Sequence, residues 1–322
     1  MKWVWRVLGW LVAAVLAAYF LWFASRALDI ARLRELATLP VVAMTLVAAL
    51  LYACIIPVTA WAWKGLLAQQ GEAWNVRPLA ALLGRPQLAK YIPGNVAQHV
   101  GRAFLSLRAG MGLRVFTVTV LQENVLAVAA SVLVGLIALA LSPGGLAQLP
   151  PESRSWLWGL GLGLAAAVVI LASVNLPPHR LANSPSRLAR ALARVGGLPG
   201  PKAVFSAFAA YSLNYVLIGL GLWLLARVAG MPPALDLAVA TAVFALSWLL
   251  GFLAPGAPAG LGVREGIMVL ILAETVSDPD ALAFVLLARV VTLMGDAIIF
   301  VASHVAIRGR FPQAGSRDEA AA

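Results

Sequence analysis

Long apolar runs without any charged side chain are the feature that most limits how this chain can fold. Five runs contain no Asp, Glu, Lys or Arg, and they cover residues 7–25, 36–63, 155–178, 203–226 and 237–263. A helix of about 20 apolar residues is long enough to cross a hydrocarbon core of about 30 Å. Because 62% of the chain is hydrophobic and only 11% is charged, a water-soluble fold could not bury so much apolar surface. The sequence therefore predicts an all-α integral membrane protein.

Three less uniform runs bring the predicted number of transmembrane helices to about eight. They cover residues 115–142, 281–307 and 260–276. The first is interrupted only by Glu123, and the second contains Arg289 and Asp296. The third begins in glycines and carries charged residues, so we predict a short or broken helix there.

Basic residues are distributed unevenly over the loops between these runs. If the N-terminus is cytoplasmic, eighteen of the 24 Lys and Arg residues fall on the cytoplasmic side and five on the other side. Cytoplasmic loops carry the excess of Lys and Arg in membrane proteins. We therefore expect both termini in the cytoplasm and the protein in a bacterial cytoplasmic (inner) membrane. Residues 1–310 then form a single polytopic transmembrane domain, and residues 311–322 form a short polar C-terminal tail.

Composition argues against several classes of function. The formal net charge of +11 is spread over membrane-flanking loops, so the expected partner is the anionic headgroup of membrane lipids and not nucleic acid. Cys54 is the single cysteine and the three histidines are scattered, so we expect no metal site and no cofactor. The sequence contains no GxxxxGKS/T phosphate loop, so no ATP-driven step is expected.

Two segments interrupt helical sequence with proline and glycine. In the first, Pro93 and Gly94 break the chain and Asn95 can cap the helix that follows. On that helix Gln98 and Arg102 lie opposite an apolar face. The second segment, APGAPAGLGVREG at residues 254–266, is predicted to be unwound, which is tolerated at membrane depth only inside protein or beside a watery cavity.

The two interruptions share a spacing that suggests an internal pseudo-repeat. Arg102 follows Pro93 by nine positions, and Arg264 follows Pro255 by nine positions. Corresponding broken segments in two halves of a membrane protein point to a transporter with its binding site between them. The alternative is that both segments are interfacial helices and ordinary loops, and the sequence leaves the two interpretations open.

These segments resemble the transmembrane region family of lysylphosphatidylglycerol synthases. The resemblance rests on LAKYIPGNVAQHVGR and APGAPAGLGVREG. The residues that match the family pattern are Lys90, Tyr91, Pro93, Gly94, Arg102, Pro255, Gly256, Gly260, Gly262, Arg264 and Glu265. In that family the membrane region is associated with moving an aminoacylated lipid between leaflets, while a separate soluble domain makes the lipid. Because this chain ends at Ala322 without such a domain, the resemblance implies lipid translocation rather than synthesis.

Charged residues inside predicted spans need a specific reason, because each costs about 2.5–3.5 kcal/mol at the centre of a membrane. Arg289 and Asp296 are seven positions apart and share one helix face. They are either functional or a structural link between helices. Glu123 is either the partner of an arginine or a carboxylate that couples transport to protons.

The function expected from these features is that of a lipid flippase, a transporter of a phosphate-bearing phospholipid, aminoacylated lipid or glycosylated lipid. We predict no enzymatic activity. The alternatives are an enzyme acting on a lipid-linked phosphate, and a scaffold that does not transport but docks a lipid-modifying or glycosyltransferase partner. The predicted substrate-binding residues are Lys90, Tyr91, Pro93, Gly94, Asn95, Arg102, Glu123, Gly262, Arg264, Glu265, Arg289 and Asp296.

Overall fold

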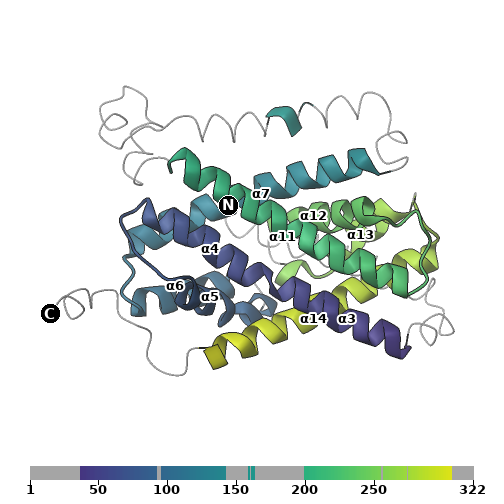
Figure 1. Cartoon of the computed structure of the whole chain (residues 1–322), viewed down its shortest axis with the longest axis horizontal. Helices are drawn as coiled ribbons and strands as arrows, with labels where there is room; N and C mark the ends of the chain where they lie inside the picture. The colour runs from purple at the N-terminus through teal and green to yellow at the C-terminus, as the bar shows by residue number, and fades with distance from the viewer. Residues whose placement is uncertain are drawn as a thin grey trace, which may run out of the picture.

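The computed structural model describes residues 37–92, 96–142, 159, 161–163, 199–254, 257–273 and 275–306, and every regular element in these ranges is helical. Four helical stretches are long and apolar enough to cross a membrane (Figure 1). They are α3 (Leu39–Ala53) continued by α4 (Ile55–Ala68), α7 (Leu113–Leu141), α11 (Pro201–Val228) and α14 (Asp278–Ala306). The predicted all-α membrane fold is confirmed, and four of the predicted spans are found.

Two other predicted spans cannot be compared with the structure. The run at 7–25 lies outside the described residues, and so does the run at 155–178 apart from residues 159 and 161–163, which are helical. The described ranges therefore hold four membrane-length helices and do not establish a total of eight.

The predicted span at 237–263 is wrong in its extent. Helix α12 (Leu237–Leu253) is followed by the 3-10 turn η2 (Pro258–Gly260) and the short helix α13 (Val263–Leu272). At 1.5 Å per residue, α12 is about 25 Å long and α13 about 15 Å, so neither crosses the hydrocarbon core alone. The two pack against each other, and α12 begins and α13 ends at the same end of the molecule (Figure 1). Together they form a hairpin that enters the bundle and turns back.

A second hairpin enters from the opposite end, where α4 ends and α7 begins (Figure 1). It consists of α5 (Val76–Gly84), the 3-10 helix η1 (Gln87–Tyr91) and α6 (Ala97–Arg108). Its turn η1 contacts α14 and also η2 of the first hairpin. The two interrupted segments thus meet inside the bundle, as expected if a binding site lies between them. Pro93, Gly94, Asn95, Pro255 and Gly256 themselves lie outside the described residues.

Helix α6 has its polar side inward and its apolar side outward. Val100 and Phe104 are 62% and 55% exposed, whereas Arg102 is 4% exposed and Ser106 is fully buried. A surface helix in water buries its apolar face, so the reversed arrangement indicates that the outer face of α6 meets lipid. The predicted division into two faces is confirmed. The residue before the first turn is Val96, which provides no side-chain cap, rather than the predicted Asn95.

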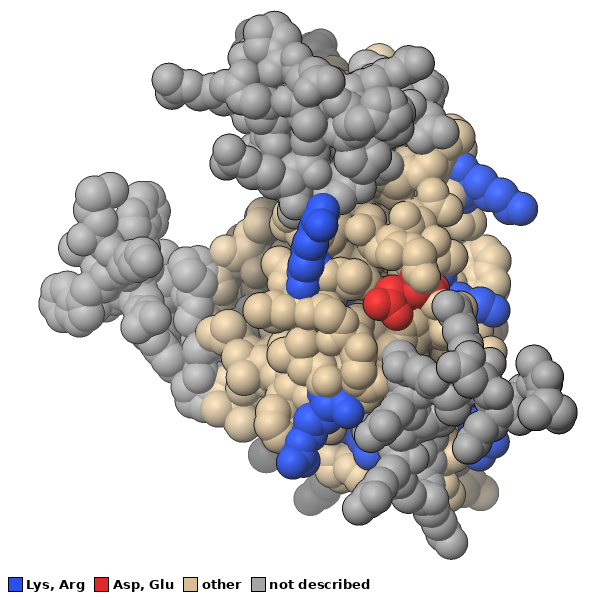
Figure 2. Space-filling view, turned by 90° about the vertical axis from the view of Figure 1, so that its left-hand side faces the viewer, with Lys and Arg blue, Asp and Glu red and all other residues tan. Residues whose placement is uncertain are grey.

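Most described basic residues lie at one end of the bundle, but three of those predicted to lie in cytoplasmic loops do not. Figure 2 shows Lys and Arg side chains spread over the end where α4 and α14 end and where α7 and α11 begin. Lys90, Arg102 and Arg264 were assigned to that side from the sequence. They are instead at most partly exposed and lie between the two hairpins, because η1, α6 and α13 carry them into the bundle.

Candidate functional site

A cavity of about 220 Å³ lies where the two hairpins meet. Its wall is formed by α3, α4, α5, η1, α6, α7, α12, η2 and α13. The polar and aromatic side chains that line it are Tyr52, Thr59, Gln87, Lys90, Gln98, His99, Arg102, Glu123, Asn124, Trp248, Phe252 and Arg264. The predicted pair Arg102 and Arg264 therefore faces one common space. Of the lining residues that the structure describes, three have cationic side chains and one, Glu123, has an acidic side chain.

Arg102 and Glu123 form a two-pronged ion pair between α6 and α7. Nη1 and Nη2 of Arg102 lie 2.8 and 2.6 Å from the two carboxylate oxygens of Glu123. The guanidinium lies over the ring of Trp63 at 3.9 Å, and the Trp63 indole N–H donates to Oγ1 of Thr119 at 2.9 Å. Paired hydrogen bonds and ring stacking fix the guanidinium in position. The predicted arginine partner of Glu123 is thus Arg102.

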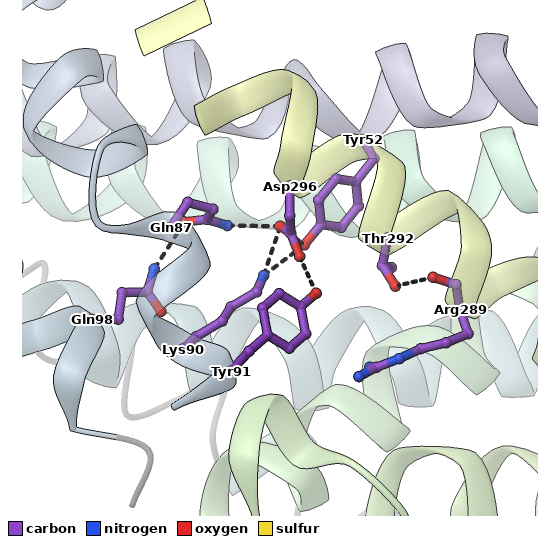
Figure 3. A network of polar contacts seen from close by, with 8 residues as sticks. All are labelled: Tyr52, Gln87, Lys90, Tyr91, Gln98, Arg289, Thr292 and Asp296. Carbon is purple, nitrogen blue, oxygen red and sulfur yellow. Dashed lines mark hydrogen bonds and ion pairs between the residues drawn. The ribbon is translucent and has the colours of Figure 1, made fainter. Parts of the chain in front are cut away.

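Asp296 is the centre of a second polar network, in which α14 holds η1 (Figure 3). Its Oδ1 accepts hydrogen bonds from Nζ of Lys90 at 2.7 Å and from Nε2 of Gln87 at 3.0 Å. The Tyr52 hydroxyl donates to the same oxygen at 3.2 Å, and the Tyr91 hydroxyl donates to Oδ2. Asp296 has no exposed surface, and four donors with one positive charge compensate it. It anchors η1 to the middle of α14.

Arg289 is paired with Glu265 and does not line the cavity. Its Nη1 lies 3.3 Å from Oε1 of Glu265, whose other oxygen accepts the backbone N–H of Gly262 at 2.7 Å. Arg289 and Asp296 share a helix face as predicted (Figure 3). They pair with different partners, Glu265 and Lys90. Arg289 is not among the residues that line the cavity, and its contact with substrate stays a prediction.

Arg264 differs from Lys90, Arg102 and Arg289 because no carboxylate pairs with it among the described residues. It is 9% exposed, and its Nε has no hydrogen-bond partner. The guanidinium lies over the Phe244 ring at 4.8 Å. A cation at this depth is costly without a counterion, so Arg264 is the group in the cavity that a bound anion would stabilise most.

Two glycines make room for the Arg264 side chain. A Cβ atom at Gly251 would overlap Cγ of Arg264, and one at Gly260 would come within 2.8 Å of Cγ and Cδ. Gly260 also has a φ of 70° and Gly262 a φ of 80°, in the left-handed region that glycine adopts without strain. Gly260 and Gly262, in the predicted unwound segment, thus allow the chain to turn. Gly260 also leaves room for the aliphatic part of the Arg264 side chain.

The structure sorts the predicted residues by position. Lys90, Arg102, Glu123 and Arg264 line the cavity. Five other predicted residues do not line it but take part in the hydrogen bonds and ion pairs around it, namely Tyr91, Gly262, Glu265, Arg289 and Asp296. Pro93, Gly94 and Asn95 lie outside the described residues. The sequence analysis missed Tyr52, Gln87, Trp248 and Phe252, which line the cavity. An aromatic residue in a span carries no local signal that separates a cavity wall from a packed core.

Comparison with known proteins gives this architecture a family. The family described as lysylphosphatidylglycerol synthase TM region matches residues 10–299. The chain belongs to this family. No match was found among individual curated proteins. Both hairpins lie inside the matched range, so the cavity is part of the lysylphosphatidylglycerol synthase TM region of the chain and not of an added segment. Within the described ranges, no group of three His, Cys, Asp or Glu side chains could hold a metal ion.

Proposed function

We propose that the protein is a lipid transporter that moves a phosphate-bearing lipid between the two leaflets of the membrane. The observation that carries this proposal is Arg264, a buried cation on a polar cavity inside the bundle that has no counterion among the described residues. A lipid headgroup cannot cross hydrocarbon unaided, since its polar groups lose water without gaining partners. The cavity offers such partners while the acyl or prenyl tails stay in the bilayer.

Arg264 is the main phosphate ligand in this scheme. Lys90 and Arg102 border the same cavity, but Asp296 and Glu123 already compensate their charges. At the start of α13, the backbone N–H of Gly262 is not free to bind a phosphate, because it donates to the Glu265 carboxylate.

The experiment is leaflet exchange in proteoliposomes, with fluorescent phospholipids that dithionite quenches from outside. A hydrogen bond to a charged group contributes about 1.5–3 kcal/mol. Arg264→Gln should therefore slow exchange by about 10- to 100-fold. The control is Arg114→Gln, the same substitution at an exposed position at the start of α7, which should exchange lipid at the wild-type rate.

Each of three results would contradict a different part of the proposal. Equal rates for Arg264→Gln and Arg114→Gln would remove Arg264 from the path. Chemical conversion of the labelled lipid would identify an enzyme. Absence of exchange with correctly folded wild-type protein would favour a scaffold that binds a partner.

A further inference from the structure

The charges around the cavity restrict the headgroup that it can accept. Four cations, Lys90, Arg102, Arg264 and Arg289, lie on the two hairpins or pair with them. Three carboxylates, Asp296, Glu123 and Glu265, compensate Lys90, Arg102 and Arg289 respectively. Among the described residues, this leaves one uncompensated positive charge, on Arg264. One negative charge on a ligand therefore neutralises the site.

We infer that the transported lipid has a monoanionic phosphodiester headgroup with an uncharged, hydroxyl-bearing substituent, and not an aminoacyl headgroup that carries ammonium groups. This inference rests on the proposed function, because it concerns the same cavity and the same Arg264. A phosphodiester brings one negative charge to one unpaired guanidinium. An ammonium group on the headgroup would bring a positive charge that needs a free carboxylate.

Among the described residues, no carboxylate near the cavity is free to receive an ammonium group. Both oxygens of Glu123 bind Arg102 at 2.8 and 2.6 Å. Both oxygens of Asp296 are engaged by the donors of η1 and by Tyr52, and the oxygens of Glu265 bind Gly262 and Arg289. An ammonium group in this space would therefore lose its water and add to an uncompensated positive site, which is strongly unfavourable.

The neutral polar groups on the cavity wall suit hydroxyls. Gln98 donates its amide N–H to Gln87, and Asn124 donates to the carbonyl of Val120, so the carbonyl oxygen of each side chain makes no hydrogen bond among the described residues. Both side chains line the cavity. Amide oxygens accept hydrogen bonds from hydroxyl groups without adding charge. A glycerol- or sugar-bearing phosphodiester thus meets one unpaired cation and at least two neutral acceptors.

The test compares three acyl-labelled lipids in the same proteoliposomes: phosphatidylglycerol, phosphatidylethanolamine and lysylphosphatidylglycerol. Phosphatidylglycerol should exchange at least about tenfold faster than the other two, since an uncompensated charge at membrane depth costs more than that factor. Arg264→Gln should remove most of this advantage, and Arg114→Gln should preserve it.

A gain-of-function variant keeps the test independent of loss of folding. Asn124→Asp has the same shape and adds a carboxylate to the cavity wall. It should raise the rate for lysylphosphatidylglycerol relative to phosphatidylglycerol by about tenfold or more.

The outcomes separate this inference from the proposed function. Lysylphosphatidylglycerol moving as fast as phosphatidylglycerol, or all three lipids moving equally, would overturn the inference and leave lipid transport intact. No exchange of any lipid by folded protein would overturn both.

Discussion

At the scale of single residues, the ion pair of Arg102 and Glu123 is a buried charge pair whose two members depend on each other. Arg102 is 4% and Glu123 9% exposed. Removing one partner of such a pair leaves an uncompensated charge and costs about 3–5 kcal/mol. We expect Glu123→Gln and Arg102→Gln each to lower the free energy of unfolding in mixed micelles by this amount. The double variant should lose much less than the sum, and additive losses would mean that the pair is not formed in the membrane.

The position of the Arg264 side chain can be disturbed without changing any charge. In Gly251→Ala the new methyl group would overlap Cγ of Arg264 and push the guanidinium away from Phe244. We expect this variant to slow lipid exchange about as much as Arg264→Gln, by roughly tenfold or more. Gly65→Ala is a matched control, because Gly65 also lies inside a helix and its nearest neighbour to a new Cβ is 3.8 Å away. Wild-type exchange by Gly251→Ala would show that the position of Arg264 does not matter.

At the scale of elements, Asp296 determines where the turn η1 lies. Gln87, Lys90 and Tyr91 all donate to this one carboxylate. Asp296→Asn keeps the size of the side chain but leaves Lys90 without a counterion, so η1 should open more often. Backbone amides of residues 87–91 should exchange with deuterium at least about tenfold faster, as expected for a loss of more than 1.4 kcal/mol in local stability. Asp278→Asn, exposed in the first turn of α14, should leave this exchange unchanged.

The reversed amphipathicity of α6 makes a prediction about its surroundings. With Cys54 replaced by Ser, nitroxide labels at positions 100 and 104 should collide with oxygen dissolved in lipid, because Val100 and Phe104 face outward. A label at position 98 should be accessible to a water-soluble nickel reagent, because Gln98 lines the cavity. Power-saturation measurements distinguish the two environments. Equal access of the nickel reagent at all three positions would place α6 in water rather than in lipid.

The elements also show which features of the fold can be predicted from residues that are neighbours in the sequence. The two faces of α6 were predictable because a helical period repeats within about four residues. The end of α12 at Leu253 was not, because the run without charges continues to Val263 and charge alone does not mark where a helix turns back. The pair of Lys90 and Asp296 was not predictable either, because 206 positions separate the two residues and no periodicity links them.

At the scale of the whole molecule, the two hairpins explain why similar Pro-Gly segments occur twice. One hairpin enters from the end where α4 ends, the other from the end where α12 begins, and their turns η1 and η2 meet (Figure 1). Each delivers one arginine to the common cavity, Arg102 from α6 and Arg264 from α13. Two segments of opposite entry around one central site are the arrangement that the predicted pseudo-repeat implies. The pseudo-repeat itself stays a prediction, because Pro93, Gly94, Pro255 and Gly256 lie outside the described residues.

The charge of the cavity also predicts how the whole protein responds to a membrane potential. The ionised side chains return to their starting positions after each cycle, so the net charge moved equals the charge of the lipid. A monoanionic headgroup moves one charge, which corresponds to about 2.3 kcal/mol per 100 mV, or about 50-fold in the leaflet ratio. A potassium gradient with valinomycin should therefore shift the distribution of labelled phosphatidylglycerol toward the positive side. Zwitterionic phosphatidylethanolamine is the control, and its distribution should not respond.

A phosphatidylglycerol ratio that ignores the potential but follows an imposed pH gradient would mean that a proton accompanies each lipid. Glu123, the one carboxylate among the described residues of the cavity wall, would then be the first candidate for its carrier.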